Sequence, residues 1–262
     1  RFNSDSHKLE YWMGSAWMQI KTFTPNIDGG ARGVFSGGDP SRDTNMDYIT
    51  IATRGNGTDF GDFPISNGTG NRGIVGSNTR GFCNGGESPS AGDSHNVIGK
   101  WEFTSTGSAI DFANLTFTSK GGPGLSNATR AVQARGYGAP SITHEDVCFF
   151  TMASQQDAVD FGDLISGSSY GGSGIASPTR GVIITARSAS VNFVNNIEYV
   201  TIATTGSFAD FGDVTNIDNA DFTASAGNST RGVLAGGQDS PNTQTEISYV
   251  TYATTGNTIK FG

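Results

Sequence analysis

The chain has 262 residues, enough for one large β domain or two ordinary domains. It carries 38 glycines, only 15% charged residues and a formal net charge of −8, which disfavours general binding to nucleic acid and docking to anionic lipid. No apolar run reaches the about 18 residues of a membrane span, and no stretch has the apolar spacing of an amphipathic helix. The composition therefore favours many short strands joined by tight turns.

The first 24 residues precede the repetitive part of the chain and predict a short β-hairpin. Its turn is expected at Met13-Gly14-Ser15, between strands that carry Tyr11, Trp12 and Trp17. We expect residues 1–24 to form a separate unit that anchors the protein.

Two sequence markers recur over residues 25–262 at intervals of about 50 residues. One is an arginine in a Thr/Ala-Arg-Gly/Ala context, and the other is a phenylalanine in Asp-Phe-Gly-Asp or a relative of it. The arginines are Arg32, Arg80, Arg130, Arg180 and Arg231, and the phenylalanines are Phe60, Phe112, Phe161, Phe211 and Phe261. Because two independent markers share one period, the sequence predicts five repeats.

Each repeat predicts four strands. The arginine marker opens a short apolar strand, and a β-branched stretch such as Glu198-Tyr-Val-Thr-Ile-Ala-Thr follows as a half-buried strand. The phenylalanine marker forms a third strand. The stretch after it, for example residues 221–227, is expected to supply the fourth.

Four strands in about 50 residues is the size of one propeller blade. The predicted fold is therefore an all-β, five-bladed β-propeller over residues 25–262, preceded by the β-hairpin of residues 1–24. A β-sandwich and a β-solenoid remain as alternatives. A β-sandwich gives no reason for a strict repeat period, and a β-solenoid usually has a much shorter repeat.

The two ends of the repeat region bear on how such a ring would close. The fifth repeat reaches Gly262 directly after its phenylalanine marker and would lack a fourth strand, which the segment Trp17–Phe23 could supply. A ring closed in this way has no long exposed sheet edge.

The repeats resemble kelch repeats, over Ala31 to Gly262. Kelch repeats have a paired glycine, then a tyrosine-containing strand, then an aromatic residue. The fifth repeat matches with Gly236-Gly237, Tyr249 and Phe261. The resemblance implies kelch-like propeller blades, although the third and fourth repeats lack the glycine pair.

Two segments resemble proteins of tailed bacteriophages. Residues 1–20, with an Arg-aromatic-Asn start and Leu9-Glu10-Tyr11, look like a hairpin module of fibre and other virion proteins. The Ile197–Gly206 stretch is similar to repeats of large marine-phage structural proteins. The resemblance implies a virion component that is assembled in the host cytoplasm, exposed on the particle, oligomeric, and in contact with other virion proteins.

The repeated charged residues favour a structural role. Each marker arginine is expected to pair with a carboxylate or a backbone carbonyl and to lock adjacent blades, with Asp62, Asp163 and Asp213 as candidate partners. The Asp-x-x-Asp pairs around the phenylalanine markers are a weak start for a calcium site, which needs six to eight oxygen ligands. They are more typical of turns.

No catalytic constellation, metal site or cofactor motif is predicted, so we expect a non-enzymatic protein with no membrane insertion. The three histidines lack a second metal ligand at suitable spacing, and no serine lies in a nucleophile turn. Cys83 and Cys148 fall at non-equivalent positions and are predicted to be buried reduced thiols.

Loop aromatics are the remaining candidates for a binding site. Tyr137, Tyr170 and Phe193 are candidate glycan contacts, because sugars stack on exposed rings. The sequence thus leaves two functions open: a virion structural protein (a decoration, fibre or tail-associated module) with possible host-surface attachment, and a carbohydrate-binding, lectin-like propeller. Five similar weak sites would gain affinity by multivalency.

Overall fold

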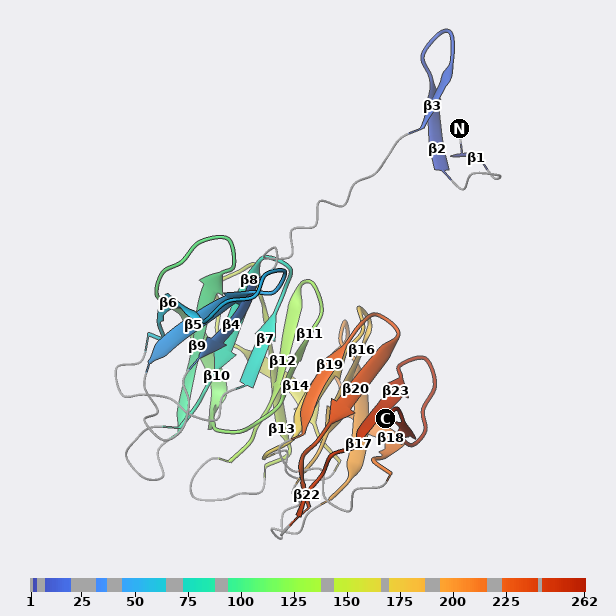
Figure 1. The fold of residues 1–262 in the computed structure, drawn as a ribbon. Coiled ribbons are helices and arrows are strands. Elements are labelled where there is room, and N and C mark those ends of the chain that lie inside the picture. The colour runs from blue at the N-terminus through green and yellow to red at the C-terminus, as the bar shows by residue number, and fades with distance from the viewer. Residues whose placement is uncertain are drawn as a thin grey trace.

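The computed structural model describes residues 2–3, 8–19, 32–36, 44–64, 73–87, 94–137, 144–165, 170–186, 194–215, 223–239 and 242–262. The regular elements in these ranges are all strands, which confirms the predicted all-β class (Figure 1). They form six antiparallel sheets of three or four strands and one two-stranded sheet. None of the described residues belongs to a helix that is long and apolar enough to cross a membrane.

The N-terminal sheet contains β1 (Phe2–Asn3), β2 (Lys8–Trp12) and β3 (Trp17–Gln19). Each repeat then forms one sheet, which we call a repeat sheet and number along the chain. The first contains β4 (Arg32–Ser36), β5 (Asn45–Thr50) and β6 (Thr58–Asp62); the second contains β7 (Gly73–Gly76), β8 (Arg80–Asn84), β9 (His95–Glu102) and β10 (Ile110–Ser119).

The remaining repeat sheets have four strands each, in sequence order. The third contains β11 (Gly124–Ser126), β12 (Arg130–Ala134), β13 (Asp146–Thr151) and β14 (Val159–Asp163); the fourth contains β15 (Ser173–Ala176), β16 (Arg180–Ile184), β17 (Asn196–Thr201) and β18 (Ala209–Asp213). The fifth contains β19 (Ala224–Gly227), β20 (Arg231–Ala235), β23 (Ile247–Thr251) and β24 (Ile259–Lys260), with the small pair β21 (Gln238–Asp239) and β22 (Asn242–Thr243) between its middle strands.

Polar side chains fix the turn that precedes each arginine strand. The Asn127 side-chain oxygen accepts hydrogen bonds from the backbone N–H of Thr129, at 3.0 Å, and of Arg130, at 2.9 Å. Asn228 does the same in the fifth repeat. Because such Asx turns reverse the chain tightly, they set the register of the following hairpin.

A β-bulge explains the Phe-Gly pair of the phenylalanine marker. In the first, third and fourth repeats the register shifts at this pair, and Gly61, Gly162 and Gly212 adopt φ values of 138°, 141° and 143°. This region of backbone space is open to glycine and strained for other residues. The bulge points the phenylalanine into the core.

The strand order corrects one prediction about the repeat. The stretch after the phenylalanine marker was expected to be the fourth strand of its own repeat, but Ala224–Gly227 pairs with β20 and opens the next sheet. The assignment was wrong because this stretch pairs with the arginine strand of the following repeat and not with the phenylalanine strand that precedes it. The fifth sheet is therefore complete without an N-terminal strand. Trp17–Gln19 pairs with β2 instead, and the rest of the proposed closing segment, residues 20–23, lies outside the described residues.

The hydrophobic core lies between neighbouring repeat sheets. One cluster joins the second and third sheets through Phe82, Phe112 and Phe150, and others join the first to the second, the third to the fourth, and the fourth to the fifth. Figure 1 shows the repeat sheets side by side, with the first and the fifth at opposite ends of the row. The described residues form separate sheets, so the predicted closed ring is not confirmed.

Candidate functional site

The marker arginines form a repeated link between neighbouring sheets, which we call the arginine joint. In the first four repeats the guanidinium donates a hydrogen bond to a backbone carbonyl of the next repeat. The pairs are Arg32 with Phe103 at 2.8 Å, Arg80 with Met152 at 2.9 Å, Arg130 with Ile202 at 2.8 Å, and Arg180 with Tyr252. This confirms the predicted role of these arginines in locking adjacent sheets through backbone carbonyls.

An aromatic ring of the same repeat supports most of these arginines. The guanidinium carbon lies 4.8 Å from the ring centroid of Tyr48 in the first repeat, 4.2 Å from that of Phe149 in the third and 4.5 Å from that of Tyr199 in the fourth. A cation over an aromatic face gains electrostatic stabilisation and is held in one orientation. The recurrence of an arginine and an aromatic residue in these repeats thus has a direct structural reason.

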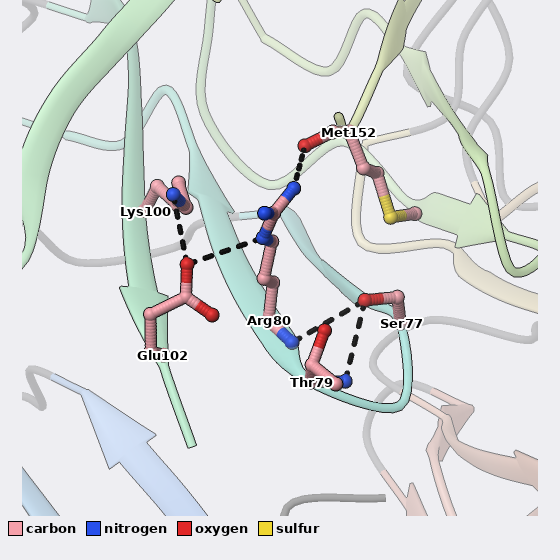
Figure 2. Close-up of polar contacts among 6 residues, drawn as sticks. All are labelled: Ser77, Thr79, Arg80, Lys100, Glu102 and Met152. Atoms are coloured by element: carbon pink, nitrogen blue, oxygen red, sulfur yellow. Dashed lines mark hydrogen bonds and ion pairs between the residues drawn. The ribbon is translucent and has the colours of Figure 1, made fainter. Parts of the chain in front are cut away.

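The second repeat holds its arginine differently, as Figure 2 shows. Arg80 Nε donates to the Glu102 carboxylate at 3.1 Å, and Lys100 Nζ lies 2.9 Å from the same oxygen. The Arg80 backbone N–H is in turn capped by the Ser77 hydroxyl at 3.3 Å. The carboxylate partner observed here is therefore Glu102, and none of the predicted partners Asp62, Asp163 and Asp213 pairs with a marker arginine in the described part of the chain.

Backbone hydrogen bonds next to the phenylalanine marker complete three of the four joints. The Phe60 carbonyl accepts from Gly107 N–H at 2.7 Å, and the Phe161 and Phe211 carbonyls accept from Gly206 and Gly256 at the same distance. A Cβ built on Gly61 would lie 2.5 Å from the Gly107 carbonyl carbon. The marker glycine is therefore required both by its backbone conformation and by the close approach of the next repeat.

The aspartates of the markers take part in local hydrogen bonds. Asp59 accepts from the Gly61 backbone N–H at 3.1 Å, and Asp62 accepts from the Thr44 hydroxyl at 3.1 Å. Among the described residues, no three His, Cys, Asp or Glu side chains gather at metal-binding distance. These carboxylates act as turn residues.

Two of the three candidate glycan contacts lie together. The rings of Tyr137 and Tyr170 are 6.2 Å apart in an edge-to-face arrangement. Lys120 Nζ lies 4.4 Å from the Tyr137 ring centroid and 2.8 Å from a carboxylate oxygen of Glu87, and both charged side chains are largely buried. Phe193 lies outside the described residues. The two tyrosines, Lys120 and Glu87 form a cluster that we call the tyrosine cluster.

A cavity of about 370 Å³ lies beside the tyrosine cluster, where the first strands of the second to fifth sheets meet. It is lined by small and hydroxyl-bearing residues: Gly73, Ile74, Gly121, Gly122, Pro123, Gly124, Gly171, Gly172, Ser173, Gly174, Thr223 and Ser225. The Tyr170 ring covers Gly121, where an added Cβ would lie 2.7 Å from the ring. The cavity offers backbone groups and the hydroxyls of Ser173, Thr223 and Ser225, a combination suited to a polar ligand such as a sugar.

Sequence reasoning missed most of this region. It did not identify Ser173, which begins β15, or Gly171 and Gly172, which line the cavity. It did not identify Lys120 or Glu87, because neither belongs to a repeated motif. The Gly-Gly-Pro-Gly run at 121–124 was the available signal, since so many glycines in one repeat mark a place where backbone segments approach closely.

Both cysteines are buried and neither forms a disulfide, as predicted. Burial raises the pKa of the Cys148 thiol to about 12, so this thiol stays protonated at neutral pH. Burial also raises the pKa of the Tyr252 hydroxyl to about 12. Neither group is prepared for nucleophilic chemistry, which requires the ionised form.

Neither a protein-family model nor a curated protein matches the sequence. The functional assignment therefore depends on the geometry of the molecule itself.

Proposed function

We propose that the protein is a non-enzymatic structural component of a bacteriophage virion, built from five kelch-like propeller blades. The observation that carries this proposal is the arginine joint. It uses the strongest repeated polar contacts of the chain to connect sheets, at four successive places. A protein whose repeated charged groups all serve packing is suited to forming a stable surface that contacts other proteins.

The N-terminal sheet supports a role in assembly. Its apolar side chains are exposed to a degree that is unusual for a single small sheet. The exposed residues are Phe2, Leu9, Tyr11, Trp12, Met13, Trp17 and Met18. The rings of Trp12 and Trp17 lie 5.4 Å apart across the hairpin in a tilted arrangement and present an aromatic pair. Such rings are enriched at the centres of protein interfaces, so this hairpin is the proposed anchor on another virion protein.

The finer fold proposal is that the repeat sheets are blades of a propeller. Each four-stranded repeat sheet is antiparallel with its strands in sequence order, and the first strands of adjacent sheets, β7, β11, β15 and β19, contact one another in turn. Blades packed face to face around their first strands are the basis of propeller architecture.

Immunogold labelling of purified particles with an antibody against this chain tests the virion assignment. Labelling at one defined position on intact particles is expected. Particles that carry no label, and whose tryptic peptides contain none from this chain, would contradict it. The assay is informative whether or not the chain binds a sugar.

The second candidate function is carbohydrate binding, and the tyrosine cluster beside the glycine-lined cavity is the observation that favours it. Here a Tyr170→Ala variant should lose binding on a glycan array, whereas Tyr249→Ala, in the fifth sheet, should retain it. Absence of saturable binding by the folded wild-type protein would exclude this function.

A further inference from the structure

The cavity beside the tyrosine cluster is bounded by four repeat sheets at once. Its walls come from β7, β11, β15 and β19 and from the short runs that lead into three of these strands. The four strands contact one another in sequence order, and each is the first strand of its sheet. Because the sheets share this cavity, it is a single feature of the chain and does not recur in every repeat.

Small residues bring these first strands close together. A Cβ added to Gly174 would lie 2.3 Å from the Gly124 carbonyl oxygen, so the backbones of β15 and β11 are in direct contact. The Ser225 hydroxyl donates to the Gly174 carbonyl at 3.2 Å, and the Ser126 hydroxyl donates to the Gly76 carbonyl at 2.8 Å. These contacts fix the spacing of all four strands. The cavity is therefore formed before any ligand enters it, which lowers the entropic cost of binding.

Two buried hydroxyl groups in the cavity wall retain hydrogen-bonding capacity. Ser173 and Thr223 line the cavity and are only 8% and 7% exposed, and their hydroxyl oxygens lie 3.0 Å apart. The two hydroxyls carry two protons, of which this contact uses one. In the described part of the chain, neither hydroxyl makes a further hydrogen bond. Because a buried donor without an acceptor costs free energy, the pair favours an occupant that brings oxygen atoms of its own.

The cavity wall carries no charge. The residues that line it, all of them described, have no ionisable side chain. Lys120, which precedes the lining residue Gly121, has its Nζ 2.8 Å from a carboxylate oxygen of Glu87, so its charge is neutralised locally. The whole chain has a formal net charge of −8. Because an unpaired charge is costly to bury, the cavity favours an uncharged ligand over one that carries a carboxylate, sulfate or phosphate group.

The volume of the cavity and the aromatic side chain beside it fit one sugar ring. At about 30 Å³ per water molecule, 370 Å³ holds about 12 waters, and a hexopyranose has a similar number of carbon and oxygen atoms. Sugar hydroxyls both donate and accept hydrogen bonds, as the hydroxyls and backbone groups of the wall do. Beside the cavity, the Tyr170 ring covers Gly121 and is held by an edge-to-face contact with Tyr137 at 6.2 Å. A ring in that place offers an apolar surface to the C–H groups of a sugar.

We propose that this cavity binds the terminal ring of an uncharged glycan, with one hexopyranose per chain. The inference rests on the second candidate function, carbohydrate binding, and names the class of sugar and the residues that contact it. The hydroxyls of Ser173, Thr223 and Ser225 hydrogen-bond to the sugar hydroxyls, and Tyr170 packs against the part of the sugar that stays outside the cavity. Binding is therefore monovalent, in contrast to a propeller lectin with one site in each repeat.

A glycan array that carries uncharged, carboxylated and sulfated glycans tests the class of ligand. The folded protein should bind saturably to uncharged glycans that end in a hexose. Calorimetric titration with the strongest of these glycans should give one ligand per chain. Binding confined to acidic glycans, or several ligands per chain, overturns this inference and leaves carbohydrate binding in place. Absence of binding to every glycan removes the second candidate function as well, while the virion assignment is decided separately by labelling of particles.

A pair of matched threonine variants tests the hydroxyl contact. Thr258 is buried like Thr223, and its hydroxyl oxygen lies 3.1 Å from that of Thr215, but it does not line the cavity. Thr223→Val removes the cavity hydroxyl and keeps the volume, so it should weaken binding of the same glycan about tenfold or more. Thr258→Val should bind as the wild type does. Equal affinities for the wild type and Thr223→Val overturn the proposal.

Filling the cavity from its edge gives a test that does not alter a buried residue. Ile74 lines the cavity and is 52% exposed, and Ile110, on the opposite edge strand of the same sheet, is 54% exposed. Ile74→Trp should obstruct the cavity and weaken glycan binding about tenfold or more, whereas Ile110→Trp should leave it unchanged. Circular dichroism establishes that both variants are folded. Undiminished binding by folded Ile74→Trp protein overturns the proposal.

Discussion

The third and fifth repeat sheets carry the same pattern but have different surroundings. Among the described residues, the third packs against a repeat sheet on each face, and the fifth packs against one. Phe161 and Phe261 occupy equivalent positions of the phenylalanine marker and contact equivalent rings, at 5.8 Å and 6.1 Å, yet one is buried and the other is exposed. The comparison teaches that a repeat is not stable by its own pattern alone: each sheet obtains its core from its neighbours, as in other repeat proteins.

The largest expected effect is at the bulge phenylalanine. Phe161→Ala should lower the free energy of unfolding by about 3–5 kcal/mol, because it leaves a cavity among Phe149, Phe208 and their neighbours. Phe261→Ala should cost less than about 1 kcal/mol in the monomer. Urea denaturation of the two variants measures the difference. Equal losses would contradict the claim that neighbours create the core.

The marker glycine should give the next largest effect. Gly212→Ala forces a side chain into a backbone with φ of 143° and toward the Gly256 backbone, and should cost about 2–3 kcal/mol. Gly262→Ala, at the equivalent position of the fifth repeat, should be nearly neutral because it faces open space. Thermal unfolding of both proteins checks this, and a comparable drop in Tm at the two positions would be inconsistent with it.

The arginine joint itself is expected to contribute less. Arg130→Ala removes a hydrogen bond from a charged donor and a cation–π contact, and should cost about 2 kcal/mol. Arg231→Ala keeps every joint within the chain and should change the stability of the monomer by less than about 0.5 kcal/mol. Denaturation at a concentration where the protein is monomeric separates the two. Arg130→Lys serves as a control that keeps the charge but lacks the planar guanidinium.

The smallest effect concerns alkaline pH. The Cys148 thiol ionises at its ordinary pKa of 9.0 in the unfolded chain but only near pH 12 in the folded protein. The unfolded state therefore loses the proton first, and the stability that the neutral thiol provides falls as the pH rises from 9 toward 12. In the Cys148→Ala variant, the free energy of unfolding should decrease less steeply with pH, by at most about 1.4 kcal/mol per pH unit. Denaturation curves at pH 8, 9 and 10 test this, and identical slopes would show that Cys148 does not contribute.

The repeat and its strands could be predicted from the sequence because they follow local rules. The arginine and tyrosine strands lie where β-branched residues alternate, and the Phe-Gly pair marks a bulge that only glycine tolerates easily. The linking role of the arginines was also predictable, since a charge that recurs at one place in each repeat needs a recurring partner. A backbone carbonyl was expected as the acceptor. Glu102 was not expected as a partner of Arg80, because this contact occurs in only one repeat.

The site depended more on tertiary structure. Tyr137 and Tyr170 were identified as aromatics outside the repeated strands, but nothing in the sequence places their rings together or brings Lys120 and Glu87 beside them. The sequence also misassigned the strand after each phenylalanine marker. Strand propensity says where a strand begins and does not say which of two adjacent sheets it joins.

The sequence by itself determined the all-β class, the period of about 50 residues and the residues that form each joint, because these depend on local conformation and on the repetition of side chains. Only the tertiary structure decided which strand opens each sheet, how Tyr137 meets Tyr170, and which equivalent residues are buried. Burial is set by what lies on the other side of a sheet, and identical sequence patterns in the inner and end repeats face different neighbours.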